Sequence, residues 1–455
     1  MGSRCSLPRL RGTVAAMRTM CCRLLAIMAA FVAARQLCGA DVNELKERRQ
    51  RAATAFSDGV LLLHSKTTMD FPSDGYREEA AFYYLTGLEN SPGTVLAIVG
   101  KSGESWLFVS AAEPKGGAES MPGEEAARKV GLDHVEDWKE MQGFLTDQTK
   151  TGAKIYYKPE VAMLPENLSA TKNSRAPSWI QVLRKNFPAA DFQPAGVKLY
   201  TLMAVESRTE RHDSNMAARA TVRAFTAGAH SIHPGASQRE VELAVVDACW
   251  KEARGVSFWP WAMAGANGVF PKPFESESRY DHLDSWMQSG DLVRLDVGCE
   301  WQHYQGDLGR TIPVSGHFSD EQREVWNIFV AAYQSVAREL KEGLSEDDAF
   351  KIWKNELLRH RESAKCLLAQ RAIETWSERK NVPYWQMHTM NLDAGYIEGP
   401  LRAGMVIDFE PIASIGGQGY YLEDMYLIRK DGATVMTRGL PYTADEMEAF
   451  LAQKP

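Results

Sequence analysis

The sequence is poor in cysteine and histidine, and it has no excess of basic residues. Only seven of its 455 residues are cysteine and ten are histidine, and 52 Lys and Arg stand against 59 Asp and Glu, a formal net charge of −7. Phosphate contacts come chiefly from clustered Lys and Arg, so this balance argues against nucleic-acid binding as the main function. Disorder is excluded as well, because 10% aromatic residues and twelve tryptophans are typical of packed cores.

Long apolar runs are also missing. Residues 24–34 form an apolar run of about 16 Å as a helix, too short to cross a ~30 Å hydrocarbon layer. Five arginines precede this run, and no acidic residue appears before Asp41. A basic start, a short apolar stretch and the small residue Ala40 predict a secretory signal peptide over 1–40, and therefore a periplasmic or secreted protein. The alternative is a frayed N-terminal helix of a cytosolic protein.

Removing residues 1–40 would change both the charge and the cysteine count. Six arginines would leave with no acidic residue, so the formal charge would fall to −13. Cys249, Cys299 and Cys366 would remain, an odd and widely spaced set without a C-x-x-C pair. That spacing argues against a disulfide scaffold, a zinc site or redox chemistry, although it leaves room for one disulfide. We expect Cys299 to be a small buried apolar residue rather than a nucleophile.

The length predicts two or three domains, and the pattern of elements changes near residue 200. Strand-length apolar runs alternate with helical stretches over 41–195, which is typical of an α/β domain of about 150 residues. Residues 196–210 are predicted as a linker. Two long helices, at 206–230 and 238–253, then precede a strand-rich region. We therefore expect 211–455 to be a larger α+β domain, and the whole chain to be α+β.

Two carboxylates fall on one hairpin in the second domain. Alternation along 292–297 places Asp296 on the face opposite Val293 and Val297. Asp307 follows eleven residues later. A tight turn around Trp301 and Gln302 would put the two carboxylates directly opposite each other, about 5 Å apart between Cβ atoms. Two carboxylates at that distance repel unless a cation lies between them or one is protonated.

A second hairpin repeats this arrangement. Glu410 and Glu423 are symmetric about Gly416-Gly417, a pair of residues that strongly favours a hairpin turn. Four carboxylates with one imidazole would suit two divalent cations about 3.5–4 Å apart. Manganese, cobalt, zinc and iron are all compatible with such ligands. A solvated face and a structural calcium site are the alternatives that the spacing leaves open.

Several motifs resemble the pita-bread metallopeptidases, specifically the aminopeptidase P and prolidase branch. The resemblance covers most of the chain after residue 40. It rests on the Phe82-Tyr83-Tyr84-Leu85-Thr86-Gly87 segment, on Gly290–Gly298, on Gly306-Asp307 followed by Arg310-Thr311, on Gly404–Pro411 and on Leu422-Glu423-Asp424. It implies a C-terminal pita-bread (creatinase/aminopeptidase) fold preceded by a smaller α/β domain. It also implies a homo-oligomer, a dimer or a tetramer.

The resemblance implies one ligand set and one reaction. The implied ligands are Asp296, Asp307, His388, Glu410 and Glu423, which would hold two divalent ions, with Mn²⁺ favoured over Co²⁺, Zn²⁺ and Fe²⁺. Glu410 would act as the general base. The implied substrate is a peptide, cleaved between an N-terminal residue and a following proline.

The sequence departs from this family around the implied site. The family usually has histidines seven residues after and four residues before the ligand histidine, where this chain has Gly395 and Tyr384. A third histidine is expected before the first aspartate strand. The candidate positions there hold Lys272 and Arg279, and His282 lies close enough to substitute as a catalytic group.

Two further positions near the implied ligands also differ. Tyr421 replaces an arginine two residues before the last ligand, and Ile412 replaces a glycine. We expect Lys272, Arg279, Tyr384 and Tyr421 to contact substrate. General acid–base groups contribute about 10²–10⁴-fold each. The departures therefore leave two alternatives to an Xaa-Pro aminopeptidase, namely a related metallohydrolase for dipeptides or a non-peptide amide, and a metal-binding pseudoenzyme.

Overall fold

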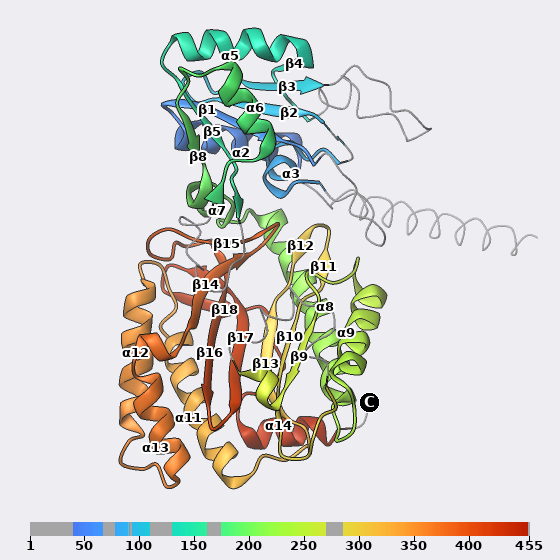
Figure 1. Cartoon of the computed structure of the whole chain (residues 1–455), viewed down its shortest axis with the longest axis vertical. Helices are drawn as coiled ribbons and strands as arrows, with labels where there is room; N and C mark the ends of the chain where they lie inside the picture. The colour runs from blue at the N-terminus through green and yellow to red at the C-terminus, as the bar shows by residue number, and fades with distance from the viewer. Residues whose placement is uncertain are drawn as a thin grey trace, which may run out of the picture.

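The computed structural model describes residues 40–66, 78–89, 91, 93–109, 130–161, 174–269 and 285–453. The predicted signal peptide, apart from Ala40, lies outside these ranges, as do Lys272, Arg279 and His282. Within them, the chain folds around two main β-sheets that lie one above the other along the long axis of the molecule (Figure 1). No helix in the described ranges has both the length and the apolar composition needed to cross a bilayer.

The first sheet is mixed and belongs to the N-terminal domain. Its strands are β1 (Gly59–His64), β2 (Val95–Val99), β3 (Ser105–Val109), β4 (His134–Asp137), β5 (Lys154–Tyr157) and β8 (Phe192–Pro194), in the order β4-β3-β2-β1-β5-β8. The helices are α2 (Val42–Ala55), α3 (Ala80–Thr86), α5 (Met141–Lys150) and α6 (Ser178–Asn186), and a small hairpin pairs β6 (Glu160–Val161) with β7 (Ser174–Arg175). Parallel β1–β5 and β5–β8 pairs flanked by helices are typical of α/β packing.

The stretch predicted as a linker carries a helix. Helix α7 (Gly196–Met203) follows β8 directly, and its Leu199 and Met203 are buried with the apolar residues of the N-terminal domain. Tyr200, on the same helix, reaches toward the second domain, as described below. The exact boundary between the domains stays a prediction.

Helices of the second domain begin where the sequence provides caps. Both α8 (Arg208–Ser231) and α9 (Gln238–Glu252) start with a capping box, formed by Ser207 with Glu210 and by Ser237 with Glu240. The remaining helices are α11 (Asp320–Ala337), α12 (Glu346–Arg359), α13 (Leu367–Trp376) and α14 (Ala444–Leu451). In Figure 1, α8 and α9 lie to one side of the strands and α11, α12 and α13 to the other.

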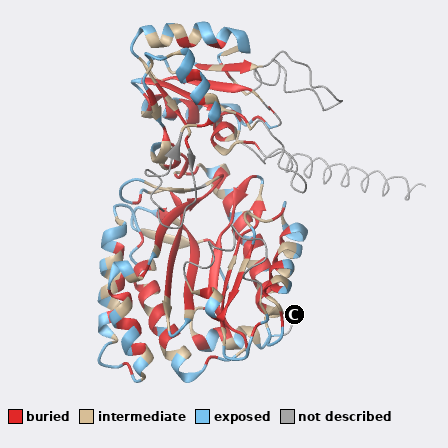
Figure 2. Ribbon diagram, viewed as in Figure 1, coloured by how far each residue is buried: buried red, intermediate tan, exposed pale blue. Residues whose placement is uncertain are grey.

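The second sheet carries the strands on which the predicted ligands lie. Its order is β15-β14-β16-β17-β13-β10-β9, with β18 also paired to β17. The strands are β9 (Trp261–Ala264), β10 (Leu292–Val297), β13 (Leu308–Pro313), β14 (Tyr384–Met390), β15 (Ala394–Tyr396), β16 (Val406–Ile415), β17 (Gln418–Arg429) and β18 (Gly432–Val435). Most of their residues are buried, whereas the outer faces of the helices are exposed (Figure 2). The α+β class is confirmed.

The first predicted hairpin exists, but its register differs from the expectation. The short strands β11 (Glu300–Trp301) and β12 (Tyr304–Gln305) are joined through Gln302 and His303, which have positive φ values of 49° and 69°. The turn is therefore one residue further along than predicted, and Asp296 lies opposite Gly309 instead of Asp307. The prediction of direct opposition is wrong. Because the error is two residues, Asp307 still shares a face with Asp296.

The second hairpin has the predicted register. Gly416 and Gly417 form its turn with φ values of 60° and 74°. Phe409 pairs with Asp424 and Ile412 with Tyr421, so the same alignment places Glu410 opposite Glu423. The turn works because glycine adopts positive φ without steric cost.

A disulfide joins two of the three cysteines that follow residue 40. Cys249 on α9 and Cys299, directly after β10, are bonded and fully buried, whereas Cys366 is free. Cys299 is buried as expected, but it is a half-cystine and not a free apolar side chain, which corrects the prediction. The two cysteines are 50 positions apart in the chain, and no local pattern indicated that they pair. The bond ties α9 to the strand that carries Asp296.

Candidate metal centre

The side chains predicted as metal ligands come from consecutive strands of the second sheet. They are Asp296 on β10, Asp307 directly before β13, His388 on β14, Glu410 on β16 and Glu423 on β17. These strands are neighbours in the order β14-β16-β17-β13-β10. Segments that are far apart in the chain therefore bring the five side chains to one region of one sheet.

The pairing of the strands places these residues on a common face. Asp296 lies opposite Gly309, which in turn lies opposite Glu423. Asp307 precedes Gly309 by two residues and so shares its face. Glu410 lies opposite Gln386, and His388 follows Gln386 by two residues. Alternation thus directs the predicted ligand side chains of both hairpins and of β14 to the same face of the sheet.

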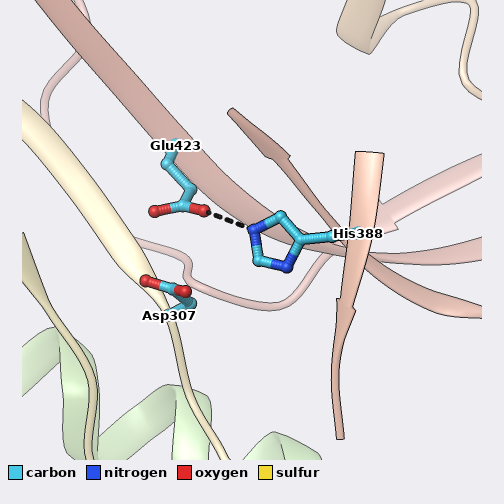
Figure 3. A group of neighbouring side chains, drawn as sticks. All are labelled: Asp307, His388 and Glu423. Carbon is cyan, nitrogen blue, oxygen red and sulfur yellow. Dashed lines mark ion pairs between the residues drawn. The ribbon is translucent and has the colours of Figure 1, made fainter. Parts of the chain in front are cut away.

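Three of the five residues form a tight group. One ligand atom each from Asp307, His388 and Glu423 lie within 4.8 Å of one another, and all three side chains are buried. Figure 3 shows them converging from separate segments of the chain, with the His388 ring directed at the Glu423 carboxylate. The Nε2 atom of His388 is 3.5 Å from Oε1 of Glu423 and 3.4 Å from Oε2 of Glu410. Glu410 therefore joins this group through His388.

Tyr421 lies between Asp296 and the group. Its ring lies over Gly309, the residue opposite Asp296, and its hydroxyl donates a hydrogen bond to Oε2 of Glu423. Asp296 is partly buried, and its Oδ1 atom is buried without a hydrogen-bond partner among the described residues. Asp296 is not one of the three residues of the tight group.

The acidic groups here carry strongly perturbed pKa values. Burial, with the charges of Glu423 and Glu410, raises the pKa of Asp296 well above its usual range. Burial and the charge of Glu423 likewise raise the pKa of Asp307, and they raise the pKa of Glu410 to about 7. Burial alone would lower the pKa of His388, but its interactions with the nearby carboxylates of Glu410 and Glu423 raise it well above its usual range. Carboxylates crowded in this way need a cation to stay ionised.

The donor set fits divalent metal ions. Oε1 of Glu423 and Oδ1 of Asp296 are buried with no hydrogen-bond partner in the described part of the chain. Unsatisfied buried carboxylate oxygens are costly, and metal coordination is one of the few arrangements that satisfies them. Carboxylates with one imidazole suit zinc, manganese, cobalt and iron. The five residues could hold such ions and would orient them on a rigid sheet.

A further acidic residue at this site was missed in the sequence. Asp408 is fully buried, and neither of its carboxylate oxygens has a hydrogen-bond partner among the described residues. It lies opposite His388 in the strand pairing and, two residues before Glu410, shares the face of Glu410. Burial and the charge of Glu423 raise its pKa well above its usual range. The same alternation that placed Glu410 would have predicted this position.

Replacing Asp408 with asparagine should weaken metal binding about 10–100-fold, as is typical for partners that surround metal ligands. The metal-free protein should be no less stable, because one of several mutually repelling carboxylates is removed. Calorimetric titration of the metal-free protein with Mn²⁺, together with thermal melts, measures both effects. Asp213→Asn is the matched control, since Asp213 is a buried carboxylate on α8 with an unpartnered Oδ1. Unchanged Mn²⁺ affinity in Asp408→Asn would contradict the expectation.

The positions of the missing histidines are filled by other groups. A side chain at Gly395 would overlap the ring of Tyr200, so α7 occupies the space that a histidine there would need. Nζ of Lys158, from the N-terminal domain, lies 2.6 Å from Oδ2 of Asp393 and 5.6 Å from the centre of the Tyr200 ring. Tyr384 shares a strand face with His388, and burial and the charge of Glu410 raise its pKa well above its usual range. Aromatic and charged groups therefore lie at or beside the two positions where the family has histidines.

Not every predicted site residue can be placed. Lys272, Arg279 and His282 lie outside the described residues, so their substrate-binding and catalytic roles stay predictions. Tyr421 is fully buried with its hydroxyl on Glu423, and Tyr384 lies on the face of β14 that carries His388. Ile412, which replaces an expected glycine, lies opposite Tyr384 and is buried.

Comparison with known proteins agrees with this geometry. Residues 214–430 match the metallopeptidase family M24, and residues 45–156 match the aminopeptidase P N-terminal domain. The chain is 23% identical to the Xaa-Pro aminopeptidase of Haemophilus influenzae and 24% identical to that of Escherichia coli. Each match covers 90% of this chain and 97% of the relative.

Solved structures share the fold over almost their whole length. Escherichia coli aminopeptidase P with the inhibitor Pro-Leu aligns with a TM-score of 0.68 at 21% identity, covering 91% of this chain and 98% of that chain. Proline aminopeptidase P II from Yersinia pestis aligns with a TM-score of 0.67 at 21% identity, covering 91% of this chain and all of that one. With the two domain matches in order and the carboxylates and histidine on one sheet face, the chain belongs to the aminopeptidase P-like pita-bread metallopeptidases and is a metallo-aminopeptidase.

Proposed function

We propose that this protein is an exported, dinuclear-metal aminopeptidase that hydrolyses the bond between an N-terminal residue and a following proline. The observation that carries the proposal is the convergence of Asp307, His388 and Glu423 within 4.8 Å, with Glu410 at 3.4 Å from His388. Asp296, Asp307, His388, Glu410 and Glu423 would hold two divalent ions, with Mn²⁺ favoured over Co²⁺, Zn²⁺ and Fe²⁺. Such a pair supplies a nucleophilic hydroxide at neutral pH and polarises the substrate carbonyl.

Glu410 is proposed as the general base. Without metal, burial and the charge of Glu423 raise the pKa of its carboxylate to about 7. Bound cations would lower this pKa and keep the carboxylate ionised, the form in which it can accept a proton. His388 lies 3.4 Å from Glu410 and can hold that carboxylate in place. Tyr384 and Tyr421, together with Lys272 and Arg279, are proposed to contact substrate, and His282 is proposed as an auxiliary acid or base.

The Xaa-Pro preference is supported by relatives. The similar proteins of Haemophilus influenzae and Escherichia coli are both Xaa-Pro aminopeptidases, and one structural neighbour holds the inhibitor Pro-Leu. One observation favours a second candidate function. Because the ring of Tyr200 fills the space beside Gly395, this position, where the family has a histidine, has no room for one. A related metallohydrolase for dipeptides or a non-peptide amide is the alternative that this change favours.

Export is supported by the disulfide between Cys249 and Cys299. Disulfides persist in the periplasm and outside the cell and are rare in the cytosol of mesophiles. Together with the basic and apolar residues of 1–40, this supports a periplasmic or secreted protein. A homo-oligomer, either a dimer or a tetramer, is proposed as the assembly. Cell fractionation and sedimentation analysis test the two proposals separately.

The experiment that tests the proposed activity combines metal analysis with a peptide panel. The metal-free protein is loaded with Mn²⁺, the bound ions are counted, and turnover is measured on dipeptides and on longer Xaa-Pro peptides. Two ions per chain and release of the N-terminal residue from Xaa-Pro peptides would support the proposal. Activity confined to dipeptides would favour the alternative hydrolase, and bound metal without turnover on any peptide would favour a pseudoenzyme.

A further inference from the structure

The face of the sheet between Asp296 and Glu423 is shaped around Tyr421. Gly309 lies between these two acidic residues in the strand pairing, and a side chain at this position would overlap the Tyr421 ring. Tyr421 is fully buried. The missing side chain at Gly309 therefore lets the tyrosine lie across β13, with its hydroxyl on the Glu423 carboxylate.

The hydroxyl of Tyr421 holds one proposed ligand. It donates to Oε2 of Glu423, and its ring lies over Gly309, the residue opposite Asp296. Oε1 of Glu423 and Oδ1 of Asp296 have no hydrogen-bond partner among the described residues. One oxygen of Glu423 is thus held by the tyrosine, and an oxygen of each carboxylate is left available for a metal ion.

Arg294 holds Tyr421 from the other side. Its guanidinium carbon lies 4.9 Å from the centre of the Tyr421 ring, and its Nη1 donates to the carbonyl of Gly268 at 3.3 Å. The side chain is 3% exposed, so the stacking is almost fully desolvated, the setting in which a cation–π contact is strongest. A Cβ at Gly419 would come within 2.6 Å of Cδ of Arg294, so the backbone there leaves room for the arginine.

A single row of the sheet fixes this pair. Arg294 on β10 lies opposite Thr311 on β13, and the Thr311 hydroxyl contacts the backbone N–H and C=O of Tyr421 on β17 at 2.8 and 3.2 Å. Two residues further along β10 and β17 lie Asp296 and Glu423. Strand pairing therefore places Arg294 and Tyr421 directly beside the acidic residues, on the same face of the sheet.

We propose that Arg294 and Tyr421 form a positioning pair that orients Glu423 for metal binding and places a fixed positive charge beside Asp296 and the acidic cluster. The inference rests on the proposed metal-dependent function. Neither residue is proposed as a metal ligand. Tyr421 holds the Glu423 carboxylate, and Arg294 holds the tyrosine ring, so the two act as one unit.

The test measures Mn²⁺ binding to the metal-free protein by calorimetry, with kcat and KM on an Xaa-Pro peptide as a second readout. We expect Tyr421→Phe and Arg294→Met each to weaken Mn²⁺ binding by about 10–100-fold. The double variant should bind Mn²⁺ no more weakly than the single variant with the lower affinity, because Arg294 acts through Tyr421. Arg294→Lys, which keeps the charge, should retain most of the affinity.

Two variants separate positioning from simple loss of structure. Tyr420→Phe removes the hydroxyl of another fully buried tyrosine on the opposite face of β17 and should leave Mn²⁺ affinity unchanged. The exchange variant R294L/Y421R moves the guanidinium to the other end of the row, and it should bind Mn²⁺ more tightly than Arg294→Leu alone. Folding of every variant is verified by circular dichroism.

The outcomes distinguish this inference from the proposed function. Wild-type affinity in both Tyr421→Phe and Arg294→Met would overturn the positioning pair while leaving the metal centre standing. Equal losses in Tyr420→Phe and Tyr421→Phe would also overturn it, because the effect would then be general to buried tyrosines. A wild-type protein that binds no divalent metal would overturn the proposed function, and the positioning pair with it.

Discussion

Glu410→Gln is expected to lower kcat by about 10³-fold or more while leaving the fold intact. The side chains have the same shape, so packing of the 5% exposed position is preserved, but the amide cannot accept the proton that a general base must take. General acid–base groups contribute about 10²–10⁴-fold to the rate. The amide is also a weaker metal ligand than a carboxylate, so the loss of kcat should lie above the lower end of that range. Turnover of an Xaa-Pro peptide at saturating Mn²⁺ is the measurement.

Glu206→Gln provides the matched control for this change. Glu206 is buried, and its Oε1 accepts a hydrogen bond from Ser214, but it is not among the groups that act on the proposed ligands. The control variant should keep wild-type kcat. If Glu410→Gln retained more than about a tenth of wild-type kcat with its metal fully bound, Glu410 could not be the general base.

Arg310→Met should destabilise the second domain by about 3–5 kcal/mol, the usual cost of breaking a buried ion pair from one side. The Arg310 and Asp424 side chains are both 0% exposed, and Nη2 of Arg310 lies 2.9 and 3.0 Å from the two oxygens of Asp424. The same guanidinium donates to the carbonyls of Gly309, Glu423 and Pro441. Removing it leaves the buried Asp424 without its countercharge, with only the hydroxyls of Thr437 and Tyr442 still donating to it, and takes a donor from several backbone carbonyls.

Urea denaturation of the metal-free protein measures this loss. The double variant R310M/D424N should recover part of the stability, because the unpaired buried charge is then gone. Arg323→Met is the surface control. Its partners Asp445 and Glu448 form an ion pair with a guanidinium that is only partly buried, and such pairs contribute about 0–1 kcal/mol. If Arg310→Met and Arg323→Met lowered the free energy of unfolding by similar amounts, burial of the Arg310–Asp424 pair would add nothing to stability.

Local patterns predicted much of the site, and long-range packing explains what they missed. Alternation along single strands was enough to place Asp296 and Glu410 on the site face, and Gly416-Gly417 fixed the register of Glu423. The first hairpin has no glycine in its turn, so nothing local marked Gln302 and His303 as the turn residues. A two-residue register error there moved Asp307 from a direct to a diagonal neighbour of Asp296.

Contacts between distant segments could not have been predicted from local patterns. The Cys249–Cys299 bond depends on how α9 packs beside β10, and three cysteines allow three different pairings. The stacking of Arg294 on Tyr421 joins β10 to β17 across β13, which only the strand order brings about. The fold class followed from the resemblance and from the change in periodicity, because both depend on the whole pattern and not on one contact.

The contact of Tyr200 with Gly395 makes the two domains depend on each other. Tyr200 belongs to a helix whose core residues pack with the N-terminal domain, and Gly395 lies on β15 at the edge of the catalytic sheet. A side chain at 395 would require the ring at 200 to move. Lys158, directly after β5, contacts both Tyr200 and Asp393 and adds a second contact from the N-terminal domain. A substitution at this edge of the sheet is therefore constrained by residues of both domains.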